Sequence, residues 1–226
     1  VAIAAQGFLC AEKERCEAVP IALTLDTAFG ECALRGVVDG VVSGGRLCVE
    51  YGRRDGKRLV DAWLKHLALS CAREGEAIRS FLFHRGDKGD VRAVFCEVEN
   101  ARSALSRLVE IYARGLREPL PLFPKCSFAY AEALAWRPAR GAKRTEAELE
   151  ERATKAALEK WRGNAFGAPG ESEALAVKLL WGEAPPWGGY ARPREGDLAP
   201  RPEFKRMAVD VFGPLVAHLV VTKEKR

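Results

Sequence analysis

The feature that most constrains the fold is the run from Cys32 to Arg54, which predicts a β-hairpin. Two stretches rich in β-branched residues flank Gly44-Gly45, and a glycine pair suits the tight turn that joins antiparallel strands. If these two residues form the turn, Asp39 lies directly opposite Glu50, with the Cβ atoms roughly 4.5–5.5 Å apart. Two carboxylates this close repel each other unless a divalent cation or a basic group lies between them.

This hairpin is similar to the metal-binding hairpin of nucleases of the PD-(D/E)XK type. In those nucleases a third position, two residues after the second acid, carries a lysine that orients and activates the attacking water. Side chains alternate along a strand, so residue 52 shares the face of Glu50, and here it is Gly52. Arg53 lies on the opposite face by the same alternation and is a weak substitute. The resemblance therefore implies vestigial nuclease positions at Asp39, Glu50 and Gly52, with no catalytic residue.

Two interpretations of the acids stay open. Asp39 and Glu50 could retain Mg²⁺, or they could form ion pairs with Arg35, Arg53 or Arg54. Mg²⁺ needs near-octahedral oxygen ligation, and hydrolysis needs a group that activates water. We favour the ion pairs and expect no cofactor for this chain, with Asp39 and Glu50 as weaker candidate Mg²⁺ ligands.

Basic residues follow the hairpin at Arg53, Arg54, Lys57 and Arg58. Such a group can bind DNA phosphates, and each neutralised phosphate adds salt-dependent affinity. The alternative, which we slightly favour, is a solvated strand end and helix start. A second basic run at 137–144 contains Pro and Gly and predicts a linker, with phosphate contact as the lesser alternative.

The composition is that of an ordinary globular protein of 226 residues, with 48% hydrophobic residues and a net charge of +5. No apolar run approaches the ~20 residues that a membrane helix needs, and the first ten residues make a poor secretory signal. The chain begins with Val, so we expect a C-terminal fragment of a larger subunit. The seven cysteines are odd in number and widely spaced, which argues against a disulfide framework or a zinc site and favours the cytoplasm.

The hydrophobic pattern predicts an α+β domain of about five antiparallel strands, followed by a helical C-terminal part. Beyond the hairpin, the expected strands are 19–25, 79–84 and 91–98. A helix after Asp55 should bury Trp63 and His66, and a helix after Asn100 should turn Tyr112 and Leu116 inward. Further expected helices are 128–136, a helix with a Thr145–Glu148 capping box that ends near Trp161, 172–181 ending at Gly182, and one from Glu203. We expect a core at 1–135 and a helical extension of the same domain at 136–226.

An ordered set of landmarks runs through the chain. The stretch 105–131 combines a helix, a Tyr-x-x-Gly step, Pro-Leu, Phe-Pro and a small-aromatic run, and 51–69 combines a tyrosine-basic strand with a tryptophan-bearing helix. Shorter landmarks follow at 159–163, 179–182 and 212–215. Together, over roughly residues 19–216, they resemble the C-terminal domain of RecC, the gamma subunit of exodeoxyribonuclease V (the RecBCD complex).

The resemblance implies a restriction-endonuclease-like (PD-(D/E)XK) α/β core that is catalytically degenerate. It implies a scaffold that docks on RecB-like and RecD-like subunits and helps to guide DNA strands during ATP-dependent processing of double-strand breaks for recombination. The chain has no Gly-x-x-x-x-Gly-Lys-Ser/Thr loop, so we do not expect it to hydrolyse ATP by itself. The alternatives are an active Mg²⁺-dependent PD-(D/E)XK nuclease and a protein-interaction module without DNA contact.

Aromatic residues in the proline-rich stretch 182–202 are the candidates for partner binding. Trp187 and Tyr190 lie there, and aromatic anchors dominate the energetics of protein interfaces. His66, by contrast, shares an apolar helix stripe with Trp63 and is expected to be a hydrogen-bonded core histidine.

Overall fold

The computed structural model describes residues 5–7, 15–86, 90–136, 145–163, 169–182 and 202–223. The chain divides into two compact units. The sheet unit comprises residues 1–54, 58–113 and 218–226, and the helical unit comprises 55–57 and 114–217. The division into a core at 1–135 and an extension at 136–226 stays a prediction.

The sheet unit is built on one mixed sheet in which the strands follow one another in chain order. Its strands are β1 (Glu17–Thr27), β2 (Gly30–Val42), β3 (Gly45–Arg53), β4 (Arg79–Arg85), β5 (Asp90–Phe95) and β6 (Leu219–Lys223). The strands expected at 19–25, 79–84 and 91–98 are confirmed in substance.

The arrangement differs from the prediction in two respects. β3 and β4 pair in parallel. The helix between them crosses the sheet and returns the chain to the end at which β3 begins, so β4 runs in the same direction as β3. The prediction of an antiparallel sheet is wrong for this pair alone. The short strand β6, which pairs with β5, was not predicted because five residues directly after a helix give too little periodicity to recognise.

Helix α2 (Gly56–Ala72) supplies the crossover and buries the expected stripe. Trp63 and His66 are almost entirely buried, and their rings stack with centroids 5.4 Å apart. His66 Nδ1 lies 2.9 Å from Ser80 Oγ on β4, so the prediction of a hydrogen-bonded core histidine is confirmed. Phe95 of β5 completes this cluster at 5.1 Å from Trp63.

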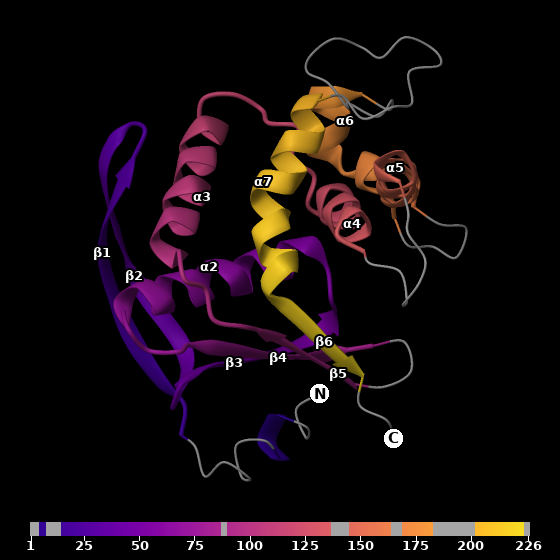
Figure 1. The fold of residues 1–226 in the computed structure, drawn as a ribbon. Coiled ribbons are helices and arrows are strands. Elements are labelled where there is room, and N and C mark those ends of the chain that lie inside the picture. Colours follow the sequence, from indigo (N-terminus) through magenta and orange to yellow (C-terminus); the bar gives the residue numbers. More distant parts are fainter. Residues whose placement is uncertain are drawn as a thin grey trace. The chain divides into compact units, whose positions relative to one another are not determined.

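Helix α3 (Ala101–Gly115) runs beside the long β1–β2 hairpin (Figure 1). Arg102 donates to the Thr24 carbonyl at 2.8 Å, and the N–H of Ala28 donates to Glu110 at 2.7 Å. The buried stripe of α3 runs through Ala101, Leu105 and Ile111. Because Ile111 faces inward, its neighbour Tyr112 is rotated outward. Tyr112 and Leu116 are 67% and 70% exposed, so the prediction that they point inward is wrong.

The opposite face of the sheet is also covered near its centre. Ala5 packs there against Val42, Leu47 and Phe83. Alternation therefore sends Leu47 to this face and sends Arg46, Cys48 and Glu50 to the face of α2.

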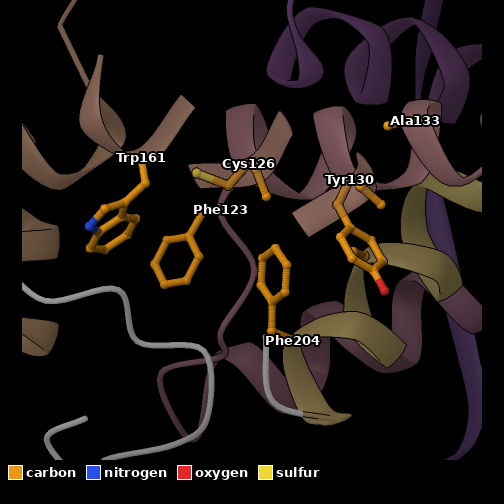
Figure 2. Close-up of a cluster of buried hydrophobic side chains, with 9 residues drawn as sticks. Phe123, Cys126, Tyr130, Ala133, Trp161 and Phe204 are labelled. Carbon is orange, nitrogen blue, oxygen red and sulfur yellow. The ribbon is translucent and has the colours of Figure 1, made fainter. Parts of the chain in front are cut away.

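The helical unit contains α4 (Pro124–Leu134), α5 (Glu146–Arg162), the 3₁₀ turn η1 (Glu171–Glu173), α6 (Leu175–Trp181) and most of α7 (Pro202–His218). Its core is aromatic: Phe123 and Phe204 lie between Trp161 and Tyr130 (Figure 2). The Phe123 and Trp161 rings meet edge to face at 5.3 Å, and Tyr130 meets Phe204 in the same way at 5.6 Å. Such pairs add about 0.5–1.5 kcal/mol each beyond simple burial.

The helix ends follow the capping rules only in part. The capping box of Thr145 and Glu148 is present at the start of α5, and Gly182 ends α6 with φ 78°, both as predicted. The helix expected over 172–181 is broken into η1 and α6. Helix α4 starts four residues earlier than expected, at Pro124, because proline fits the first turn of a helix.

Within the described residues the cysteines are free, and Cys48, Cys71 and Cys126 are buried as core side chains. Helices in this part of the chain lack the combination of length and hydropathy that crossing a bilayer requires.

Candidate functional site

The turn of the predicted metal-binding hairpin lies one residue earlier than expected. Val41 pairs with Arg46 and Val42 pairs with Gly45, so Ser43 and Gly44 form the loop. Gly44 takes φ 69°, which favours glycine, whereas Gly45 belongs to β3. A side chain at Gly45 would collide with the backbone of Arg79 on β4. The second glycine is therefore needed for the close approach of two strands rather than for the turn.

This register overturns the predicted pairing of Asp39 with Glu50. A loop at 43–44 shifts the partner of each β2 residue by two positions relative to the prediction. The β2–β3 pairing also ends at Val41, so Asp39 has no partner residue on β3. The two acids are not cross-strand neighbours, and the repulsion expected from that pairing does not arise.

Asp39 is bound by two basic side chains. Arg46 Nη2 lies 3.2 Å from Asp39 Oδ1, and Arg46 Nε donates to the Asp39 carbonyl at 2.9 Å. Lys65 Nζ on α2 lies 3.9 Å from the same carboxylate oxygen. Partial burial raises the pKa of Asp39, but the hydrogen bond and charge of Arg46, with a smaller contribution from Lys65, outweigh it and lower the pKa. Asp39 is therefore ionised and neutralised within the chain.

Arg46 is a buried cation on β3 that pairs with Asp39. Its side chain is only 4% exposed, while that of Asp39 is 75% exposed. Buried charges are stable only when paired or hydrogen-bonded, and Arg46 obtains both from Asp39. Its Nη1 has no hydrogen-bond partner among the described residues.

Glu50 is bound by Arg58 from the first turns of α2. Arg58 Nε lies 3.5 Å from Glu50 Oε2, and Arg58 Nη1 donates to the Arg53 carbonyl at 2.8 Å. The same guanidinium fills the space beside Gly52: a Cβ there would collide with Arg58, whose Nη2 would lie 2.6 Å away. Glycine at this position is thus matched to Arg58, and a lysine could enter only if Arg58 moved.

The interpretation of the acids as ion-paired side chains agrees with these contacts. Arg46, Lys65 and Arg58 are partners that the sequence did not indicate. Two of these partners lie on α2. Sequence spacing within the hairpin could not indicate a helix that packs across it.

A small cavity lies between the end of β3, β4 and α2. It measures about 10 Å³, the size of one water molecule. Its lining comprises Cys48, Glu50, Arg53, Arg54, Arg58, Leu59, Ala62, Leu82, Phe83 and His84. The fold therefore brings Glu50 together with three of the four predicted DNA-binding residues. Lys57 is exposed and does not line the cavity.

His84 is a residue of this site that sequence reasoning missed. It pairs in parallel register with Glu50 and is only 6% exposed. Burial lowers the pKa of His84, the charge of Arg54 lowers it further, and the backbone of Arg85 partly opposes this. Neither ring nitrogen makes a hydrogen bond of normal geometry within the described residues. Its only signal in the sequence was a histidine at the end of an apolar strand. The parallel pairing of β3 with β4, which places His84 opposite Glu50, was not predictable.

The thiol in the cavity lacks the character of a nucleophile. Burial raises the pKa of Cys48, the charge of Arg46 opposes this, and the charge of Glu50 adds to it. A reactive cysteine needs a lowered pKa. Cys48 is therefore a core side chain.

A comparison with protein families gives this site a context. The family model described as RecC C-terminal domain matches residues 4–135, more than half of the chain. The chain belongs to the RecC C-terminal domain family. The matched range contains the hairpin, α2 and the cavity, together with α3 and α4.

Curated relatives carry the same RecC name. The chain is 27% identical over 194 residues to the "RecBCD enzyme subunit RecC" of Mycobacterium tuberculosis, which covers 81% of this chain and 16% of that protein. It is 34% identical over 102 residues to the "RecBCD enzyme subunit RecC" of Mycolicibacterium smegmatis, covering 44% of this chain and 9% of that protein. The chain thus spans about one sixth or less of the length of these RecC proteins.

The residues of the RecC-type hairpin do not fit a magnesium centre. Mg²⁺ demands several oxygen ligands in near-octahedral geometry, yet Asp39 and Glu50 are each occupied by basic side chains. No group of three or more His, Cys, Asp or Glu residues in the described ranges is arranged to hold a metal ion.

The remaining predicted residues lie outside the described part of the chain. These are Trp187 and Tyr190, predicted to bind a partner, and the second basic run at 137–144.

Proposed function

We propose that this chain is a non-catalytic, nuclease-like scaffold domain of exodeoxyribonuclease V. It docks on RecB-like and RecD-like subunits in the cytoplasm and helps to guide DNA strands during double-strand-break processing for homologous recombination. Its core is a restriction-endonuclease-like (PD-(D/E)XK) fold that has lost catalysis. Membership of the RecC C-terminal domain family supports the complex, and the names of the curated relatives support its RecBCD type.

The observation that carries the non-catalytic role is the placement of Arg58. Its guanidinium takes the space that a side chain at residue 52 would need and pairs with Glu50. In a working nuclease of this type, that space holds the lysine and Glu50 faces a metal ion. The guanidinium of Arg58 therefore occupies the space in which a water-activating lysine and a metal ion would both have to bind.

The strand-guiding role draws on the basic residues at the mouth of the cavity. Arg53, Arg54 and Arg58 gather there, and a backbone-tracking contact needs only phosphates and cations. Arg53 ends β3 and Arg54 directly follows it, and we take this pair as the candidates for phosphate contact. Two such contacts give weak affinity that depends on sequence little and on salt strongly.

A nuclease assay tests the absence of catalysis. The purified chain is incubated with single- and double-stranded DNA in Mg²⁺ and in Mn²⁺, beside an Asp39→Ala, Glu50→Ala double variant. We expect no cleavage from either protein. Cleavage by the parent chain that the double variant loses would overturn the proposal and establish the alternative, an active metal-dependent nuclease.

The salt dependence of DNA binding tests strand guidance. We expect binding to single-stranded DNA to weaken with salt, and the slope of log K against log[salt] to fall by about 1.4 in an Arg53→Ala, Arg54→Ala variant. An Arg73→Ala, Arg107→Ala variant removes the same charge away from the cavity and is expected to keep the slope. No measurable DNA affinity would favour the third alternative, an interaction module without DNA contact.

Partner docking has its own test. We expect the chain to bind purified RecB-like or RecD-like subunits in a pull-down. If it binds neither, the docking role fails.

A further inference from the structure

The long β1–β2 hairpin leaves one strand edge open. β2 pairs with β1 along its length, from Gly30 opposite Thr27 to Val41 opposite Glu17. On its other side it pairs with β3 only through Val41 and Val42. Within the described strands, residues 30–40 therefore have no second partner strand. Such an edge presents backbone N–H and C=O groups that can pair with another chain.

An apolar groove lies beside this open edge. It has a volume of about 210 Å³ and lies between β1, β2, α2 and α3. Leu34, Gly36 and Val38 of β2 form one side. Leu64 and Leu105 are among the helix residues of the other side. Gly36 leaves the groove open, because a Cβ added there meets no atom within 4 Å.

The charges at the groove are positive and few. Arg35 is an exposed lining residue of β2, and alternation places its side chain on the face opposite Leu34, Gly36 and Val38, at the open edge. Lys65 also lines it but is already paired with Asp39 and, at 3.2 Å, with Asp61. Among the described lining residues the cations are Arg35 and Lys65, and an apolar surface with so few cations suits an apolar peptide with a single acid. Nucleic acid would need several cations and aromatic stacking surfaces, which this lining lacks.

We propose that an extended apolar segment of a partner subunit adds as a strand to the open edge of β2. Alternate side chains of that segment enter the groove over Gly36, and one carboxylate on the opposite face of the segment pairs with Arg35. An extended segment is favoured over a helix because the open edge offers main-chain hydrogen bonds. This inference rests on the docking role proposed above and locates it on the sheet unit.

The experiment fills the groove without altering the hairpin. Gly36→Leu places a side chain in open space, and Ala33→Leu makes a matched change on the same strand at an exposed residue outside the groove. Both variants and the parent chain are titrated with the RecB-like and RecD-like subunits, after thermal melting confirms that each is folded. We expect Gly36→Leu to weaken binding at least tenfold and Ala33→Leu to change it less than twofold.

Amide exchange locates the contact. The outward-facing amides among residues 31–38 should exchange at least tenfold more slowly in the assembled complex than in the free chain. If the parent binds but Gly36→Leu binds equally well and these amides stay unprotected, the inference is wrong while the docking role stands. If the parent binds neither subunit, both fail. Protection of these amides by single-stranded DNA alone would identify a nucleic-acid groove and overturn the peptide assignment.

Discussion

Arg58 shows how one side chain can define the chemistry of a neighbouring position. It approaches Gly52 so closely that a side chain there would fit only if Arg58 moved, and it also pairs with Glu50. The space beside Gly52 is therefore filled by the guanidinium of Arg58, and a larger residue at position 52 would require Arg58 to move.

We predict that Gly52→Ala lowers the free energy of unfolding by about 1 kcal/mol or less. The methyl group must push Arg58 aside, which breaks its hydrogen bond to the Arg53 carbonyl and its ion pair with Glu50. The loss is small because both contacts are exposed and the side chain is flexible. Urea denaturation measures it. Gly36→Ala is the control and should be neutral or slightly stabilising, since its Cβ meets nothing and alanine is favoured over glycine in a strand.

His66 makes stability depend on pH. Burial lowers its pKa to about 4, against 6.5 for the free side chain. Between these values the unfolded chain binds a proton that the folded chain does not, so stability falls as the pH drops from 6.5 toward 4. His66 alone would account for a loss of about 3 kcal/mol at pH 4. Unfolding measured across this range should show the slope.

The control for the pH dependence is His66→Gln, which removes the titrating group while retaining hydrogen-bonding atoms. Between pH 6.5 and 4 we expect the free energy of unfolding of this variant to fall less steeply with pH than that of the parent. The difference in slope should correspond to the binding of about one proton. An NMR titration in which the His66 ring of the parent protonates near pH 6.5 would contradict the assignment.

At the scale of elements, helix α4 depends on a residue far away in the chain. Its N-cap position, Phe123, offers no capping side chain. The carboxylate of Glu171, in η1, accepts the N–H of Lys125 at 3.0 Å and that of Cys126 at 2.8 Å. A negative charge at a helix N-terminus also interacts favourably with the helix dipole. This cap fixes the start of α4 to η1.

We predict that Glu171→Ala destabilises the chain by about 1–2 kcal/mol, because it leaves two N–H groups at a buried helix start without acceptors. Glu173→Ala is the matched control. Glu173, itself exposed, accepts the N–H of Gly170 at 2.8 Å in a partly buried bond, and its loss should cost less than 1 kcal/mol because it frees one N–H rather than two. If both variants lose the same free energy of unfolding in chemical denaturation, the cap formed by Glu171 stabilises the chain no more than that formed by Glu173.

Elements with strong local signals were predicted correctly. The strand over 19–25, the stripe of α2 and the capping box at Thr145 each depend on residues within a few positions of one another. The hairpin was predicted as well, but its register was not. The chain offered three adjacent small residues, Ser43, Gly44 and Gly45, and the choice between two loops depends on the close approach of β4 to Gly45.

At the scale of the whole molecule, the two units have separate cores. Trp63 and Phe95 lie in the sheet unit, while Phe123, Trp161 and Phe204 lie in the helical unit.

We predict that Phe204→Ala destabilises the helical unit by about 3–5 kcal/mol, since Phe204 is fully buried against Phe123 and Tyr130. Amide exchange should quicken in α4 and α5 and change little in β4. The control is Leu179→Ala on α6, where the side chain is 76% exposed, and it should shift stability by less than 0.5 kcal/mol. Equal loss of protection in β4 would mean that the two cores unfold together.

Some residues of the candidate site lie close together in the sequence, and others reach the site only through the tertiary fold. Asp39, Glu50 and Gly52 were recognisable because they share one hairpin, and Arg53, Arg54 and Arg58 because they follow it directly. His84, Arg46 and Lys65 were not assigned to it, although they complete its charges and its lining. His84 and Lys65 reach the hairpin through the parallel pairing of β4 and the packing of α2.

The sequence by itself determined the family, the elements with strong local periodicity and the position of the hairpin. These depend on residue types at short spacing, and short spacing fixes local geometry directly. The tertiary structure decided the hairpin register, the parallel pairing of β3 with β4 and the partners of Asp39 and Glu50. Each of these depends on which distant segments pack together, and that is settled by the burial of side chains over the whole fold rather than by any one stretch of chain.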